Sequence, residues 1–272
     1  MTTSIVEFRR TTPRPPLDTF VEAVWAVRGS AGYRRFVMLP NGAVQLMINF
    51  GAPHRVRVAG GRSLDRECRA AWIAGLQDAP LEIESPPASD LLAIRFRPGG
   101  AHAVLPLPLH AVTNDVIEAD DVLRHAVAEL RDRLALAESW PARLRITENW
   151  LLARLRPRET DHRRIAAAVS ALAAHDRSSV QTTCTQLGLS NRHLIALFRG
   201  LVGLPPKSFA RVQRFHAALA RLPTTANRAG LAAELGYADQ AHFGNEFRRL
   251  AGVAPGEFIA RRGADNESLI VG

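Results

Sequence analysis

The stretch that decides the fold is GYADQAHFGNEFRRLAGVAP, residues 236–255 of the 272-residue chain. A related stretch, GLSNRHLIALFRGLVGLPP, occupies residues 188–206. A shift of 49 residues brings six apolar, Gly or Pro positions into register: Leu194 with Phe243, Phe198 with Phe247, Leu201 with Leu250, Gly203 with Gly252, Pro206 with Pro255 and Phe209 with Phe258. The C-terminal third of the chain therefore contains two copies of one structural unit.

Each copy begins with a short helical pattern that ends at a glycine. Gly188 and Gly236 stand where the first helix must stop, and a positive φ is expected there. Ser190 and Asp239 can cap the helix that follows. A small residue four positions before each glycine lets the two helices cross closely. This order of elements predicts a helix-turn-helix in each copy.

The second helix of each copy combines a buried apolar stripe with a polar outer face. The outer-face residues are Asn191, Arg192, Ile195, Ala196 and Arg199 in the first copy and Gln240, Ala241, Gly244, Asn245, Arg248 and Arg249 in the second. Each face starts with groups that can read base edges and ends with Arg that can meet phosphate. A single exposed amide or Arg is usually only solvated, but the same order in two matched copies favours DNA binding.

Positive charge is concentrated in the same region. The formal net charge is +9, and the segment from Arg177 to Arg262 holds twelve Arg or Lys against four Asp or Glu. Residues 1–176 carry a net charge of only +3. An anionic partner such as DNA fits this distribution. Besides Arg199, Arg248 and Arg249, we expect Lys207 and Arg211 to contact phosphates.

Residues 161–262 resemble the DNA-binding domain of AraC/XylS-type transcriptional regulators, and residues 236–255 match the family signature nearly throughout. The resemblance implies two helix-turn-helix units that dock in successive major grooves, joined by a long helix near residues 206–222. The candidate base-facing residues are Asn191, Arg192, Ile195, Gln240, Ala241 and Asn245. Thr183 and Cys184 stand where the family usually has Leu and Ala.

The N-terminal half is rich in short apolar runs separated by turn residues, as expected of a small antiparallel sheet, sandwich or barrel. The runs expected to be strands are Arg35–Leu39, Ala43–Phe50, Arg55–Ala59, Ala71–Leu76, Leu81–Glu84 and Leu91–Phe96. The segments Leu39–Gly42 and Phe96–Gly100 and the surroundings of Trp25 resemble the β-rich domains of one branch of these regulators. The resemblance implies a cupin-like domain that senses a ligand or mediates dimerisation.

Helical periodicity follows the strands. Leu123, Val127, Leu130 and Leu134 recur at helical spacing, and a second helical segment runs from residue 141 to 155. This stripe forms either a dimer seam or part of the core of its own domain. A polar linker at residues 155–161 leads to the C-terminal helices, with Asp161 as the expected N-cap.

The sequence has no motif for a disulfide framework, a metal site or an enzyme. Two cysteines, Cys68 and Cys184, cannot form a disulfide framework or a four-cysteine zinc site, and His54, His102 and His110 are too far apart for a cupin metal site. We expect no enzymatic activity, cofactor or metal. Apolar stretches are too short to cross a membrane and the N-terminus lacks a signal peptide, so a cytoplasmic location is expected.

The predicted fold class is α+β, with two domains. Residues 1–157 form a β-rich sensory or dimerisation domain with a helical connector, and residues 161–263 form an all-α double helix-turn-helix domain. The predicted function is a sequence-specific transcription factor that binds double-stranded DNA. Further candidate partners are a small-molecule effector, a second copy of the chain and RNA polymerase, with no membrane partner. The alternative is a small-molecule-binding module whose DNA-binding half has become non-specific.

Overall fold

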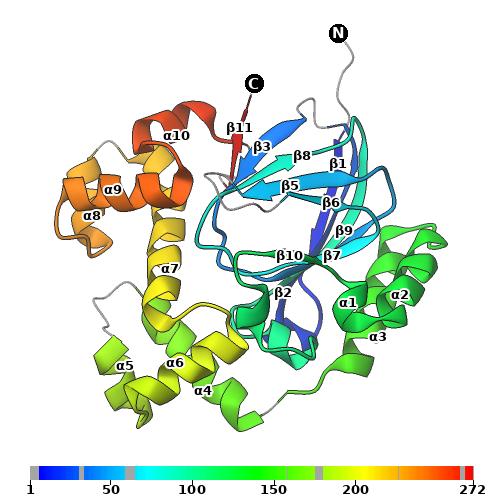
Figure 1. Cartoon of the computed structure of the whole chain (residues 1–272), viewed down its shortest axis with the longest axis horizontal. Coiled ribbons are helices and arrows are strands. Elements are labelled where there is room, and N and C mark those ends of the chain that lie inside the picture. Colours follow the sequence, from blue (N-terminus) through cyan, green and yellow to red (C-terminus); the bar gives the residue numbers. More distant parts are fainter. Residues whose placement is uncertain are drawn as a thin grey trace.

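A computed structural model describes residues 6–30, 34–58, 65–157, 159–174, 180–225, 227–263 and 267–271. The N-terminal half forms two antiparallel sheets, and the C-terminal half is helical (Figure 1). The first sheet has the strand order β1-β2-β9-β4-β7-β10, and the second has the order β11-β3-β8-β5-β6. The strands are β1 (Val6–Thr11), β2 (Val21–Gly29), β3 (Arg35–Met38), β4 (Gln45–Asn49), β5 (His54–Val58), β6 (Asp65–Cys68), β7 (Ala71–Ala74), β8 (Leu81–Glu84), β9 (Ser89–Phe96), β10 (Val116–Glu118) and β11 (Ser268–Ile270).

The α-helices follow every strand except β11 in the chain and lie on two sides of the sheets (Figure 1). They are α1 (Asp120–Leu123), α2 (His125–Ala135), α3 (Trp140–Arg154), α4 (Glu159–Ala173), α5 (Val180–Leu187), α6 (Asn191–Leu201), α7 (Pro206–Arg221), α8 (Arg228–Glu234), α9 (Gln240–Ala251) and α10 (Pro255–Arg261). Four 3-10 turns complete the described elements: η1 (Leu17–Thr19), η2 (Ala101–Ala103), η3 (Leu109–Val112) and η4 (Leu222–Thr224). The α+β class with a β-rich N-terminal half is therefore confirmed.

Each predicted strand overlaps a strand of the structure, with small differences at the ends. Residue 59, the predicted end of one strand, lies outside the described residues. The strands that the prediction missed fall into three kinds. β1 and β6 are charged edge strands and β10 and β11 have only three residues each, whereas β2 holds an apolar run at residues 23–27 that was present in the sequence.

The prediction of a dimer seam along α2 is wrong, and the alternative interpretation of that stripe is confirmed. Leu123, Val127, Leu130 and Leu134 are all buried within the chain and belong to its largest hydrophobic core. Trp150 of α3 covers them and donates a hydrogen bond from Nε1 to the Ala126 carbonyl at 2.9 Å. A stripe that already packs against its own domain has no surface left for a partner.

The largest core crosses the predicted domain boundary. It joins Ile94 of the sheet and Leu130 of α2 to Ile165 of α4 and to Leu194 and Phe198 of α6. A second core lies under α7, α8, α9 and α10, and a third fills the space between the two sheets. The first helix-turn-helix unit is thus packed together with the N-terminal half, while the second has a separate core that takes in Leu39 after β3 and Leu269 of β11.

The C-terminal segment returns to the N-terminal half. β11 pairs antiparallel with β3 at the edge of the second sheet, and the two lie side by side in Figure 1. The Glu267 carbonyl accepts a hydrogen bond from the Leu39 amide at 2.8 Å. Helix α4 begins at Glu159, so Asp161 lies within its first turn and is not the N-cap that we predicted.

Candidate nucleic-acid interface

The turns of the two repeat copies have the geometry that the sequence predicts. Gly188 and Gly236 have φ values of +62° and +75°, in the left-handed region that glycine adopts without strain. The Ser190 hydroxyl accepts a hydrogen bond from the His193 amide at 3.2 Å. In the second copy, Asp239 Oδ1 accepts the matching hydrogen bond from the His242 amide at 2.7 Å. Both second helices, α6 and α9, therefore begin at a capped residue and in a defined direction.

The apolar stripes of α6 and α9 are buried, which determines which faces point outward. Leu194 and Phe198 are fully buried in the first unit, as are Phe247 and Leu250 in the second. Phe247 also makes edge-on ring contacts in its core, with a centroid distance of 5.1 Å to Phe215 of α7. The opposite face of each helix is therefore left for a ligand.

The structure exposes every side chain that we expect to face bases. The exposed set is Asn191, Arg192, Ile195, Gln240, Ala241 and Asn245. Of the predicted phosphate contacts, Arg199, Lys207, Arg248 and Arg249 are exposed. Arg211 is half-buried and donates a hydrogen bond to the Ser208 hydroxyl at 3.1 Å. A Cβ atom added to Gly244 would meet no atom within 4 Å, so this face has room for close approach.

The outer faces of α6 and α9 carry similar residues at their two ends and different residues in the middle. Matched positions carry an amide at the start of each helix, Asn191 or Gln240, and an Arg in the third turn, Arg199 or Arg248. The positions between these ends pair Arg192 with Ala241, Ile195 with Gly244 and Ala196 with Asn245. A face with the same ends and different middle positions can dock in the same way on two different base sequences.

Helix α7 separates the two units. It has 16 residues and is therefore about 24 Å long. α5 and α6 lie at its start and α8, α9 and α10 at its end (Figure 1). This length is of the same order as the ~34 Å that divides successive major-groove faces of a duplex. One rigid helix can thus hold the two reading helices over neighbouring grooves.

A buried ion pair fixes α9 on α7. Glu246 is only 9% exposed, and its Oε1 lies 3.2 Å from Nη2 of Arg214 on α7. The Arg214 guanidinium also stacks over the Tyr237 ring, 4.5 Å from its centroid. Burial and the adjacent Glu246 raise the pKa of the Tyr237 hydroxyl above its ordinary value, against a smaller opposite effect of Arg214. Our prediction missed this pair, although Glu246 interrupts an apolar stripe where the first copy has Leu197.

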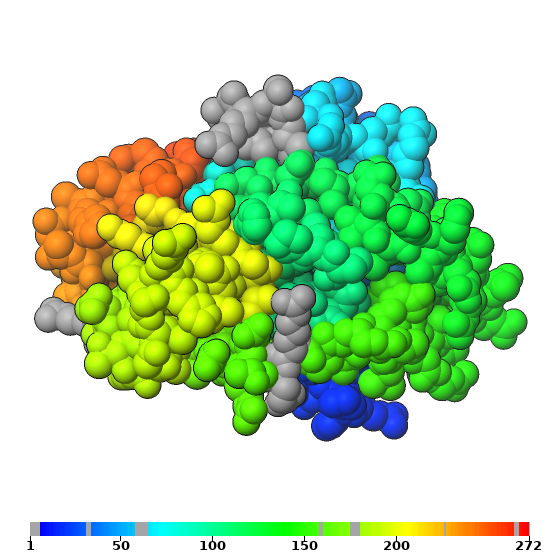
Figure 2. Space-filling view, turned by 60° about the horizontal axis from the view of Figure 1, so that its bottom comes forward, coloured from blue at the N-terminus to red at the C-terminus, as the bar shows by residue number. Residues whose placement is uncertain are grey.

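The first unit is held by the N-terminal half instead. The Thr113 hydroxyl donates a hydrogen bond to the Gly203 carbonyl at 2.9 Å, and Nδ1 of His110 lies 3.3 Å from the Arg199 carbonyl. Both contacts come from η3 or the residue after it and reach the C-terminal end of α6. Figure 2 shows this part of the N-terminal half and the first unit as one continuous surface. The start of α6, where Asn191 and Arg192 lie, stays exposed.

Comparison with protein families agrees with this geometry. Residues 183–261 match the model of a helix-turn-helix domain family. This segment is an AraC-type helix-turn-helix domain. The AraC-type domain places the chain among DNA-binding transcription regulators. Residues 9–118 match a family described only as a domain of unknown function, DUF6597.

Solved structures resemble the chain at low sequence identity. ToxT from Vibrio cholerae is 8% identical, with a TM-score of 0.47, and the match covers 94% of this chain and 98% of ToxT. ToxT bound to (E)-4-(8-methylnaphthalen-1-yl)but-3-enoic acid is 9% identical, with a TM-score of 0.48 and the same coverage. An AraC-type regulator domain from Chromobacterium violaceum is 23% identical, with a TM-score of 0.35, over 38% of this chain and 94% of that one. No curated protein matches the chain.

The remaining titratable groups of interest are buried. Burial lowers the pKa of His54 to about 4, and its Nδ1 lies 3.3 Å from the Ser85 hydroxyl. Burial, with a smaller effect of Glu118, raises the pKa of the Cys68 thiol to about 12, so it stays protonated at neutral pH. Cys184 is buried between helices, as its position in the repeat predicts. The described residues contain no group of three His, Cys, Asp or Glu side chains that could hold a metal ion.

No described helix is both long and apolar enough to cross a membrane.

Proposed function

We propose that the AraC-type domain reads two different half-sites, one with each of its two reading helices. The observation that carries this proposal is the pair of exposed faces on α6 and α9. Both faces have an amide at the start and an Arg in the third turn, but they differ at the positions between these two. An amide suits adenine N6 and N7, and a guanidinium suits guanine O6 and N7. Arg192 and Asn245 therefore read different bases in different half-sites.

The phosphate contacts of the proposal have a separate role. Arg199 and Arg248 lie beyond the base-facing positions of their helices and are both exposed. Phosphate contacts position a protein on the duplex without reading its sequence. We assign the same role to Lys207, Arg211 and Arg249.

Selection of random duplexes by the purified full chain tests the proposal. We expect a motif of two unlike half-sites separated by about one helical turn. In a series of base-substituted operators, Arg192→Ala and Asn245→Ala should each lose about 1–3 kcal/mol of discrimination at positions in different half-sites. Arg248→Ala should weaken binding to every duplex alike and make the salt dependence shallower.

The control is Arg145→Ala, which removes one exposed Arg from α3 in the N-terminal half. Its effect on affinity should be small compared with that of Arg248→Ala, because it keeps the reading faces intact. Recovery of no motif would favour the alternative, a small-molecule-binding module with a non-specific DNA-binding half. Uniform loss of affinity with Asn245→Ala would remove Asn245 from the base readers.

The proposal also assigns roles to the N-terminal half. We assign it the sensing of a small-molecule effector or the pairing of two copies, and we place RNA polymerase among the partners of the DNA-bound protein. The contacts of His110 and Thr113 with α6 support a sensing role, because they link the N-terminal half directly to the first reading helix. A change at η3 would alter the position of α6. We assign no catalytic role to this half.

A further inference from the structure

Strand β1 is an open sheet edge. It pairs with β2 without a bulge from Val6 to Thr11 and is the end strand of the six-stranded sheet among the described strands. The other end strands are shorter, with three residues in β10 and β11 and four in β6. Five of the six residues of β1 are exposed, and it has no Pro or Lys. It therefore has no bulge or proline to keep the edge from pairing, and its protection rests on the charges of Glu7, Arg9 and Arg10.

The two faces of β1 differ in chemistry. Phe8 pairs across the ladder with Val27, so it points toward the core between the two sheets. It is nevertheless 59% exposed, and its ring centroid lies 6.1 Å from that of Trp25. An aromatic ring that is half outside an apolar core marks a place where a further strand could add.

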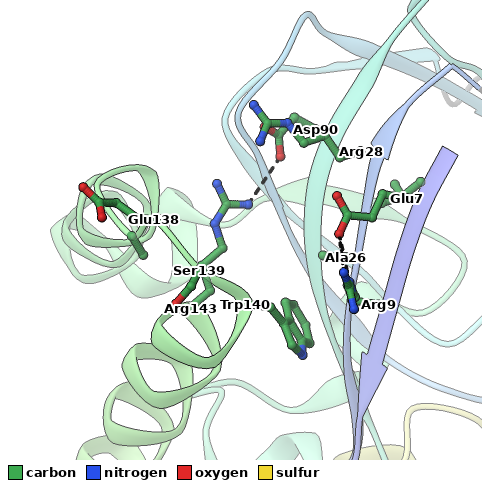
Figure 3. Close-up of a pocket in the computed structure, with 11 residues that line it drawn as sticks. Glu7, Arg9, Ala26, Arg28, Asp90, Glu138, Ser139, Trp140 and Arg143 are labelled. Atoms are coloured by element: carbon green, nitrogen blue, oxygen red, sulfur yellow. Dashed lines mark hydrogen bonds and ion pairs between the residues drawn. The ribbon is translucent and has the colours of Figure 1, made fainter. Parts of the chain in front are cut away.

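Glu7 and Arg9 lie on the opposite face, toward α3. They form an ion pair of 2.8 Å and line a groove of about 150 Å³ with Trp140 and Arg143 (Figure 3). Trp140 Nε1 donates a hydrogen bond to the Thr11 hydroxyl at 3.1 Å, which holds the end of β1 against α3. Both charged side chains thus sit at a fixed edge of the sheet, one residue before and one after Phe8.

We propose that β1 is an interface for a second copy of this chain, which adds antiparallel to it. A two-fold axis at Phe8 places Phe8 opposite Phe8 and sets Glu7 of each copy opposite Arg9 of the other. Neighbouring registers that keep the same faces together are centred on Glu7 or Arg9 and set like charges directly opposite each other. The strand is therefore complementary to itself in one register.

Charge reversal tests this register in the full chain without DNA, so the outcome is independent of base reading. Sedimentation velocity over a concentration series should show a reversible dimer for the natural sequence. Glu7→Arg and Arg9→Glu should each raise the dimer dissociation constant at least about tenfold, because each sets two like-charged pairs across the interface. An equimolar mixture of the two variants should dimerise again, since every charged pair across the axis of the mixed dimer then joins an arginine to a glutamate.

Phe8→Ser should also weaken the dimer, whereas Leu136→Ser serves as the control. Leu136 is 84% exposed on the loop after α2, so its change removes a similar apolar surface away from the strand edge. Circular dichroism identifies any variant that fails to fold. A natural chain that stays monomeric at all concentrations would overturn the proposal. So would single charge reversals that dimerise as strongly as the natural chain, or a mixture that stays monomeric.

Discussion

The two helix-turn-helix units are copies in sequence but are held in place differently. The first shares its core with the N-terminal half, and η3 contacts the end of α6 through His110 and Thr113. The second has a separate core, which reaches the N-terminal half only through the sheet edge at Leu39 and Leu269, and it rests on α7 through the Arg214–Glu246 pair. One reading helix is therefore coupled to the N-terminal half, while the other is coupled to the connecting helix. The repeat preserves the outward face of each second helix, whereas the contacts that hold each unit differ.

Matched core truncations should show this difference most strongly. Phe198 and Phe247 occupy equivalent positions and are both fully buried. Each change to Ala should cost about 3–5 kcal/mol. Because Phe198 lies in the shared core, Phe198→Ala should speed amide hydrogen exchange in both the first unit and the N-terminal half. Phe247→Ala should do so in the second unit and, outside it, only at the sheet edge around Leu39 and Leu269, and an effect of the same extent in both variants would contradict separate cores.

The buried ion pair provides the next largest effect. Arg214→Met leaves Glu246 buried without its cation and should destabilise the second unit by about 1–3 kcal/mol. The double change Arg214→Met with Glu246→Leu, which imitates Leu197 of the first copy, should recover most of that loss. Chemical denaturation monitored by circular dichroism measures both. If the double variant is no more stable than Arg214→Met, the loss of stability does not come from the unpaired charge of Glu246.

The stability contributed by Glu267 of the C-terminal segment should depend on pH. Burial opposes ionisation of Glu267, but hydrogen bonds and charge from His216 and Arg95 outweigh it and lower the pKa of this carboxyl below its ordinary value. The Arg95 Nη1–Glu267 Oε2 distance is 3.0 Å. A lowered folded-state pKa means that this contribution to stability is complete above the ordinary pKa of 4.5 and is lost as pH falls through the folded-state value.

Glu267→Gln removes the charge and keeps the shape. At neutral pH it should lower stability by about 1 kcal/mol, the order expected for one intramolecular hydrogen bond. The difference in Tm between the natural chain and this variant should shrink as the pH falls below the ordinary carboxyl pKa. A difference that stays constant from neutral to acidic pH would show that the charge of Glu267 adds nothing to this contact.

The smallest expected effect on stability concerns a matched surface position. Gly244 lies within α9 with open space around its missing Cβ, where the first unit has Ile195. Gly244→Ala should stabilise the second unit by about 0.5–1 kcal/mol, because glycine loses more conformational freedom in a helix. Ile195→Ala should change stability by less than about 0.5 kcal/mol. Thermal unfolding compares the two, and destabilisation by Gly244→Ala would mean that this face is not open.

Local signals account for most of what could be predicted in the C-terminal half. The glycines that end the first helices and the caps Ser190 and Asp239 act within a few residues, so their effect can be read directly from the chain. The exposed faces follow from the buried stripes, because helical spacing fixes both at once. The base contacts assigned to Arg192 and Asn245 stay predictions.

Partners distant in the chain account for what was missed. The α2 stripe has the same periodicity whether it meets α3 or a second copy, so the sequence pattern alone could not choose between them. Glu246 stands out in its stripe, but its partner Arg214 lies 32 residues earlier, on another helix. The edge strand β1 carries three charged residues among six, so its two apolar residues give only a weak strand pattern.

The amino-acid sequence by itself determined the two helix-turn-helix copies, their caps and their outward faces, because each depends on contacts within a few residues and on a repeated apolar period. Only the tertiary structure decided that the first copy shares a core with the N-terminal half. It also decided that Glu267 and β11 return to the second sheet and that α2 is buried. Those outcomes depend on which surfaces meet across long loops, and the free energy of such pairings is a property of the whole packed chain.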